Sequence, residues 1–183
     1  MKRYRIHKKF QLNGISFSSD QELLSYAHNF SEDLYHFFES WFSEDDFILV
    51  NTSGYTGVTK EIMLQKEHMI HSALTTGKYF NLGENTTGLL CLPIQFIAGK
   101  MMLIRALLLG WKLDIVVPDA SPLRNTQKEY DFTAMVPLQL ENSIKSLHLI
   151  KTLIVGGGVV SQRLQQKIRF CKSNKNSRGQ LSF

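Results

Sequence analysis

The chain has 183 residues, of which 43% are hydrophobic, so it is long and apolar enough to form one domain with a real core. No run approaches the ~20 apolar residues of a membrane span, and the charged residues 1–5 exclude the apolar start of a signal peptide. The net charge is +5, but the basic ends lack the motifs of nucleic-acid-binding proteins. Cys91 and Cys171 have no metal-type spacing. We therefore expect a cytoplasmic protein that binds neither membranes nor nucleic acids.

The first part of the chain predicts a small β-hairpin followed by two helices. Apolar residues alternate loosely across residues 3–17 around Asn13-Gly14, a pair that is typical of a tight hairpin turn. Across residues 20–42 the apolar residues recur every three or four positions, with a break near residues 29–31. This spacing indicates two amphipathic helices, and Ser19 is a suitable N-cap for the first. The acidic residues between them are expected to face solvent.

A predicted strand at residues 47–50 runs directly into a loop that is rich in Thr, Ser and Gly and ends in a lysine. Glycine lets backbone N–H groups approach a phosphate closely, hydroxyl groups donate hydrogen bonds to it, and lysine supplies a positive charge. Gly54 and Gly57 are too close together for the common NTPase loop G-x-x-x-x-G-K-(S/T), which is excluded. An ordinary solvated turn is the alternative. The candidate phosphate-binding residues are Thr52, Ser53, Gly54, Tyr55, Thr56, Gly57 and Lys60.

The rest of the chain predicts alternating strands and helices. Further strands are expected at residues 61–64, 87–93, 111–117, 130–136 and 151–155, and helices at residues 66–80, 97–109 and 137–147. This order implies right-handed crossovers and an α/β fold, with a mostly parallel sheet flanked by helices and the small N-terminal β-hairpin beside it. His68 and His71 share a helix face, but without a third ligand they predict no metal site.

Three consecutive glycines follow the last predicted strand. Gly156, Gly157 and Gly158 would let a ligand lie flat against the backbone, although a plain strand-to-helix turn is an equally simple explanation. Arg105 lies within an otherwise apolar helix, and we expect it to tie the fold together instead of contacting a substrate.

Residues 52–60, which read T-S-G-Y-T-G-V-T-K, resemble the T-S-G-(S/T)-T-G-x-P-K signature of the adenylate-forming superfamily. Tyr55 and Thr59 depart from that signature. The segments 92–99, 105–110, 136–137 and 155–158 are similar, in the same order, to the family's L-P-x-x-H-x-x-G, R-A-L…G, V-P and G-G blocks. Phe96 stands where many members have histidine. The chain most resembles the short o-succinylbenzoate:CoA ligases of menaquinone biosynthesis.

The resemblance implies an ATP-dependent acid:CoA ligase, which adenylates a carboxylate and then forms a thioester. It implies ATP, Mg²⁺ and coenzyme A as cofactors, and a small carboxylic acid, o-succinylbenzoate first, as the substrate. By similarity, the seven loop residues would bind the β- and γ-phosphates of ATP. The acyl and adenine pocket would include Gln95, Phe96, Gly156, Gly157 and Gly158.

The family's later motifs, Y-G-x-T-E, T-G-D and a C-terminal catalytic lysine, do not occur in this sequence, so no catalytic set is complete. We expect residues 1–170 to form a partial N-terminal AMP-binding domain and residues 171–183 to be a disordered polar tail. A sheet that stops after the glycines would leave an unpaired edge, which favours self-association or a complementing chain. Three hypotheses stay open: a truncated ligase that is inactive alone, a non-catalytic nucleotide-binding module that needs a second chain, and a degenerate remnant without a ligand.

Overall fold

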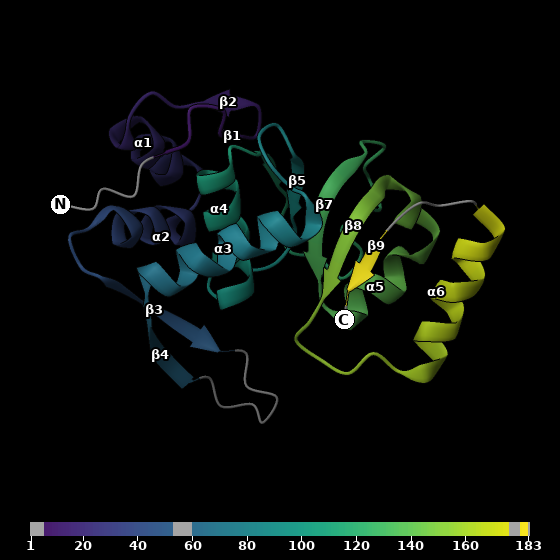
Figure 1. Cartoon of the computed structure of the whole chain (residues 1–183). Helices are drawn as coiled ribbons and strands as arrows, with labels where there is room; N and C mark the ends of the chain where they lie inside the picture. Colours follow the sequence, from purple (N-terminus) through teal and green to yellow (C-terminus); the bar gives the residue numbers. More distant parts are fainter. Residues whose placement is uncertain (1–5, 53–59, 176–179, 183) are drawn as a thin grey trace.

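A seven-stranded sheet and a separate two-stranded ribbon organise the fold (Figure 1). The computed structural model describes residues 6–52, 60–175 and 180–182, and the side chains of residues 6–51 and 61–168. The strands are β1 (Gln11–Leu12), β2 (Ile15–Ser16), β3 (Phe47–Thr52), β4 (Lys60–Gln65), β5 (Thr87–Leu90), β6 (Lys112–Ile115), β7 (Tyr130–Met135), β8 (Ile150–Val155) and β9 (Gln180–Ser182). The helices are α1 (Asp20–Phe30), α2 (Glu32–Phe42), α3 (Lys66–Phe80), α4 (Ile97–Leu109), α5 (Pro137–Ser143), the 3-10 helix η1 (Ile144–Leu149) and α6 (Gln162–Lys175).

The large sheet has the strand order β2-β1-β6-β5-β7-β8-β9, and β3 pairs with β4 in the ribbon. Every neighbouring pair in the large sheet is parallel except β1 with β2. This topology confirms the predicted α/β fold and the mostly parallel sheet. No helix in the described part of the chain is long and apolar enough to span a membrane.

The N-terminal hairpin and the two helices after it form where the sequence predicts them. Asn13 and Gly14 both have positive φ angles, 50° and 80°, as the two central residues of a type I′ turn require. The Ser19 hydroxyl accepts a hydrogen bond from the backbone N–H of Glu22 at 3.2 Å. Ser31 both ends α1 and caps α2 in the same way, so it marks the predicted break between the helices.

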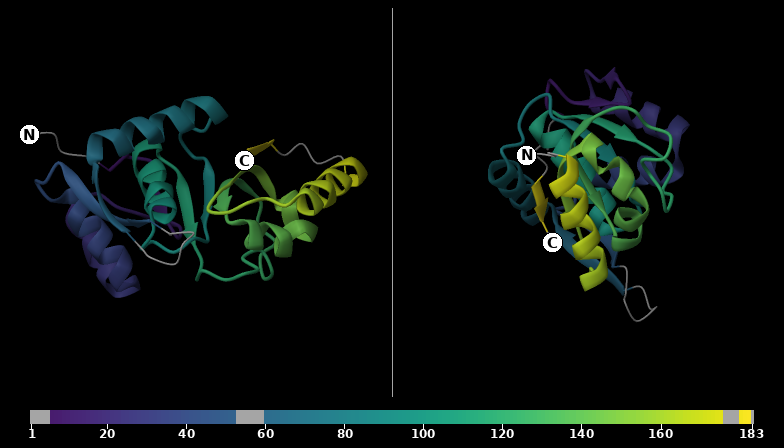
Figure 2. Two further views of the ribbon diagram at one scale, coloured as in Figure 1. Left: turned by 90° about the horizontal axis from the view of Figure 1, so that it is seen from below. Right: turned by 90° about the vertical axis from the view of Figure 1, so that its right-hand side faces the viewer.

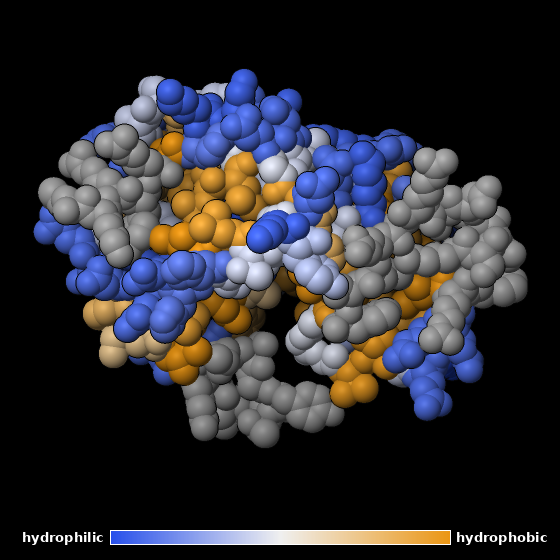
Figure 3. Space-filling model, viewed as in Figure 1, coloured by the Kyte–Doolittle hydropathy of each residue, from blue (hydrophilic) through white to orange (hydrophobic). Residues whose placement is uncertain are grey.

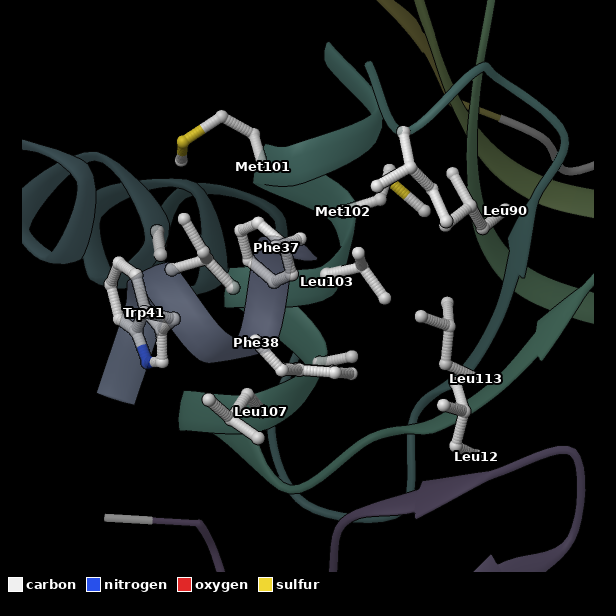
Figure 4. Close-up of a cluster of buried hydrophobic side chains, with 14 of the residues drawn as sticks. Leu12, Phe37, Phe38, Trp41, Leu90, Met101, Met102, Leu103, Leu107 and Leu113 are labelled. Carbon is white, nitrogen blue, oxygen red and sulfur yellow. The ribbon is translucent and has the colours of Figure 1, made fainter. Parts of the chain in front are cut away.

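The main core lies between the N-terminal helices and one face of the sheet. Figure 4 shows Phe37, Phe38 and Trp41 of α2 beside buried side chains of α4 and of the strands. Helix α4 is apolar nearly all round because it is enclosed by α2, α3 and the sheet. Helices α5 and α6 lie on the opposite side of the sheet (Figure 2), and a second core of buried side chains lies beneath them. Leu90 contributes to the first core and Leu89 to the second. Successive side chains of a strand point to opposite faces of the sheet, and both faces of β5 are covered.

The structure differs from the prediction at some ends of elements. Strand β5 ends three residues early, before Pro93, which lacks the N–H that a central strand donates. The helix that begins at Pro137 tightens into η1 after Ser143. The segment predicted as a polar tail contributes residues 171–175 to α6, whose Leu164 and Ile168 are buried in the second core, and residues 180–182 to β9. Because β9 pairs with β8, the edge of the sheet on this side is β9 instead of β8, and among the described residues no strand pairs with the other side of β9.

Candidate functional site

The predicted phosphate-binding loop follows strand β3 and precedes strand β4 in the chain. Strands β3 and β4 pair in register from Phe47 opposite Gln65 to Thr52 opposite Lys60. The structure therefore places Thr52 and Lys60 directly across from each other, one at the end of β3 and one at the start of β4. The five loop candidates between them, Ser53, Gly54, Tyr55, Thr56 and Gly57, lie outside the described residues.

Buried contacts fix the base of the ribbon to the body of the protein. Ile48 and Val50 point from β3 into the main core. Lys66, which follows β4, is fully buried, and its Nζ donates hydrogen bonds to the carbonyl of Ser43 at 3.0 Å and to its hydroxyl at 3.3 Å. Burial lowers the pKa of Lys66, although Asp45 and Asp46 act in the opposite direction. The ribbon is thus tied to the end of α2.

The loop before α4 lies beside β3. Phe96 forms an isolated parallel bridge with Asn51, the residue before Thr52. The side chain of the preceding residue, Gln95, donates from its Nε2 to the two carboxylate oxygens of Asp33 on α2 at 3.2 and 3.4 Å. The structure therefore brings the backbone of Phe96 to the strand that carries the phosphate loop, and Gln95 lines a cavity together with Leu49 and Asn51 of that strand. The cavity, of about 230 Å³, lies beside this contact, between α2, β3 and the start of α4.

The three glycines after β8 lie against the start of α5. The N–H of Gly156 donates to the carbonyl of Met135 at 3.1 Å. Gly157 has a φ of +75°, and a Cβ built on it would lie 3.2 Å from Val136; one on Gly158 would lie 3.4 Å from Pro137. The V-P block at residues 136–137 and the G-G-G block at residues 156–158 are therefore in contact at the start of α5.

This place is the carboxyl edge of the parallel sheet, where α/β proteins bind ligands. All three glycines are exposed, as are Leu138 and Val159 after the neighbouring strands β7 and β8. In Figure 3 the surface is hollowed between the side that carries β3 and β4 and the side that carries α5. The exposed glycines leave the backbone after β8 open to close approach by another group.

Arg105 is the cation that the sequence explains least well. Its Nε is buried on α4 with no hydrogen-bond partner among the described residues, and its Nη1 lies 4.0 Å from the sulfur of Met102. The guanidinium lies 6.0 Å from the ring centre of Phe132 on β7. Burial lowers the pKa of Arg105 to about 10, so the group keeps its charge at neutral pH without a carboxylate partner in the described part of the chain.

The described residues contain no cluster of three or more His, Cys, Asp or Glu side chains that could hold a metal ion. His71 lies 3.8 Å from Glu67, one turn away on the same exposed helix surface.

No protein-family model matches the sequence. No curated protein matches it either. Among solved structures, the chain is similar to an acyl-CoA synthetase (AMP-forming)/AMP-acid ligase II-like protein from Dyadobacter fermentans, with 34% sequence identity and a TM-score of 0.68. That match covers 74% of this chain and 41% of the other. This chain has the fold of the N-terminal domain of adenylate-forming enzymes.

Two further solved structures have the adenylate-forming fold at lower identity. A double mutant of o-succinylbenzoate CoA synthetase (MenE) from Bacillus subtilis, bound to its product analogue OSB-NCoA, is 21% identical with a TM-score of 0.58, and the match covers 67% of this chain and 27% of that one. ATP-bound MatB from Rhodopseudomonas palustris is 17% identical with a TM-score of 0.56, over 67% of this chain and 26% of that one. The chain thus spans less than half the length of these structures.

Proposed function

We propose that this chain is the nucleotide-binding part of an ATP-dependent acid:CoA ligase, with o-succinylbenzoate as its acid. The observation that carries the proposal is the contact between the glycine run and the V-P block at the sheet edge, within a fold whose solved neighbours include acyl-CoA synthetases. Solved neighbours bound to ATP and to an o-succinylbenzoate product analogue support the choice of ligands. The protein would act together with Mg²⁺ and coenzyme A.

The seven candidates from Thr52 to Lys60 would bind the β- and γ-phosphates at the ribbon tip. Gly156, Gly157 and Gly158 would line the acyl and adenine pocket. Gln95 and Phe96, the two residues before α4, would contribute to the acyl side; Gln95 also donates to Asp33 and lines the cavity beside β3. The Y-G-x-T-E and T-G-D motifs and the catalytic lysine do not occur in residues 1–183, so the ligase reaction would need a polypeptide segment that supplies them.

Acid-dependent exchange of labelled pyrophosphate into ATP tests this function. The chain alone should exchange at least ~100 to 1,000-fold more slowly than it does with a polypeptide that carries the missing motifs, because each lost electrostatic donor costs about that much. Exchange should require o-succinylbenzoate, with succinate and benzoate as controls. Gly157→Val should abolish it, since a valine there strains the left-handed backbone and meets Val136.

The other outcomes separate the alternatives. ATP binding without exchange under all these conditions would favour a non-catalytic module that needs a different second chain. Neither binding nor exchange would favour a degenerate remnant.

A further inference from the structure

Strand β4 has a free edge. It pairs with β3 on one side, and no other described strand pairs with its opposite side. Figure 1 shows β4 as the outer strand of the ribbon. An edge strand presents unpaired N–H and C=O groups to which another strand can add. A two-stranded ribbon is also only marginally stable by itself and gains from a third strand.

The outer face of the ribbon is apolar next to this edge. Leu49 of β3 and Met63 of β4 are cross-strand partners, and the two residues are 53% and 64% exposed. Phe47, two residues before Leu49 on the same face, is 41% exposed. Neighbouring exposed apolar side chains of this kind commonly mark an interaction surface.

We propose that β4 pairs with β4 of a second copy of this chain, antiparallel and about a two-fold axis at Met63. In this register Met63 faces Met63 of the partner subunit. Ile62 faces the partner's Leu64, and Glu61 faces the partner's Gln65. The two ribbons then form one four-stranded sheet, with the two phosphate-loop tips at opposite ends.

A second copy is favoured because the strand complements itself in this register. The outer face gains one continuous apolar row, Leu49 and Met63 followed by the partner's Met63 and the partner's Leu49. Within residues 61–65, Glu61 is the sole charged residue, and it faces a glutamine amide that can donate a hydrogen bond to its carboxylate. At the start of β4, Lys60 faces the partner's Lys66, and in each chain the Nζ of Lys66 donates to Ser43 of the same chain. An axis at Glu61 would instead place two carboxylates opposite each other. A shift of pairing by one residue would bring together side chains from opposite faces. The inference is independent of the proposed ligase function.

Disulfide trapping tests both the pairing and its register. In a Cys171→Ser background, which retains the buried Cys91, Met63→Cys should form a covalent dimer under mild oxidation at least about tenfold faster than Leu74→Cys. Leu74 is a matched control because it is an exposed apolar residue on α3. Glu61→Cys and Gln65→Cys should each be slow alone, and the variant that carries both should be fast. Equal rates at Met63 and Leu74 would overturn the proposal.

Sedimentation velocity gives a second test that needs no cysteine. The unmodified chain should shift from monomer to dimer over about a hundredfold range of concentration, because a five-residue strand pairing is a small interface. Met63→Lys should remain monomeric over this range, since an edge lysine blocks strand addition, and its unfolding midpoint at low concentration should not change. A chain that stays monomeric throughout, or a Met63→Lys variant that still dimerises, would contradict the proposal.

Discussion

Gly99→Ala should lower the free energy of unfolding by about 3 kcal/mol. A Cβ at this position in the first turn of α4 would lie 2.3 Å from the carbonyl oxygen of Pro93 and 3.0 Å from the Cα of Ile94. Both are backbone atoms, so a side-chain rotation cannot relieve the contact. Relief requires the loop of residues 93–96 to move away from α4, against its hydrogen bonds and the bridge to β3. Urea unfolding measures the change directly.

Gly83→Ala is the matched control for this prediction. A Cβ at Gly83 would have no atom within 4 Å, and its φ is not in the left-handed region. The control should stay within about 0.5 kcal/mol of the unmodified chain, as surface substitutions usually do. If Gly99→Ala changed the free energy of unfolding as little as Gly83→Ala does, the close approach of α4 to residues 93–96 would be contradicted. The placement of Phe96 beside β3 would then be contradicted as well.

Arg105→Met should raise the free energy of unfolding by about 1–3 kcal/mol. The folded protein holds the Arg105 cation in an environment that lowers its pKa to about 10, which means that folding disfavours the charged form at neutral pH. Methionine keeps much of the side-chain volume without the charge, and it leaves no buried N–H unpaired. The gain should shrink above the folded pKa, as the native guanidinium begins to lose its proton. Urea titrations at pH 7 measure the main effect.

Arg105→Lys separates the effect of the charge on stability from the effect of the side-chain shape. Arg105→Lys keeps a cation on α4 and should show no gain in stability. A loss of stability in Arg105→Met would instead mean that the guanidinium ties the fold together, as its sequence context suggests.

Much of the fold follows from local sequence signals. Helices α3 and α4 begin and end at the predicted residues. Their ends are set locally, because each helix is followed by a residue suited to the left-handed conformation, Asn81 with φ 54° and Gly110 with φ 72°. The pairing of β3 with β4 follows from two apolar runs on either side of a loop rich in glycine and threonine. Such signals act over a few residues, so a single sequence contains them.

The parts that the sequence does not predict depend on contacts between distant segments. Gln95 turns toward Asp33, which lies 62 residues away in the chain, and no local pattern encodes that choice. Lys66 is buried because α2 ends beside it, although a lysine at the start of a helix usually faces water. Strand β9 joins the sheet from a polar stretch with no strand periodicity, where the backbone pairing with β8 outweighs side-chain preference.

A thermal unfolding scan with and without millimolar Mg·ATP tests most directly whether this chain binds a nucleotide at the ribbon tip. Ligand at ~100 times its dissociation constant adds about 2.7 kcal/mol, which should raise the midpoint of a chain of this size by about 5–10 °C. We expect ATP to raise the midpoint of the unmodified chain and to leave that of Lys60→Ala nearly unchanged. A cooperative transition that is indifferent to ATP in both proteins would contradict a nucleotide site at the tip of the ribbon.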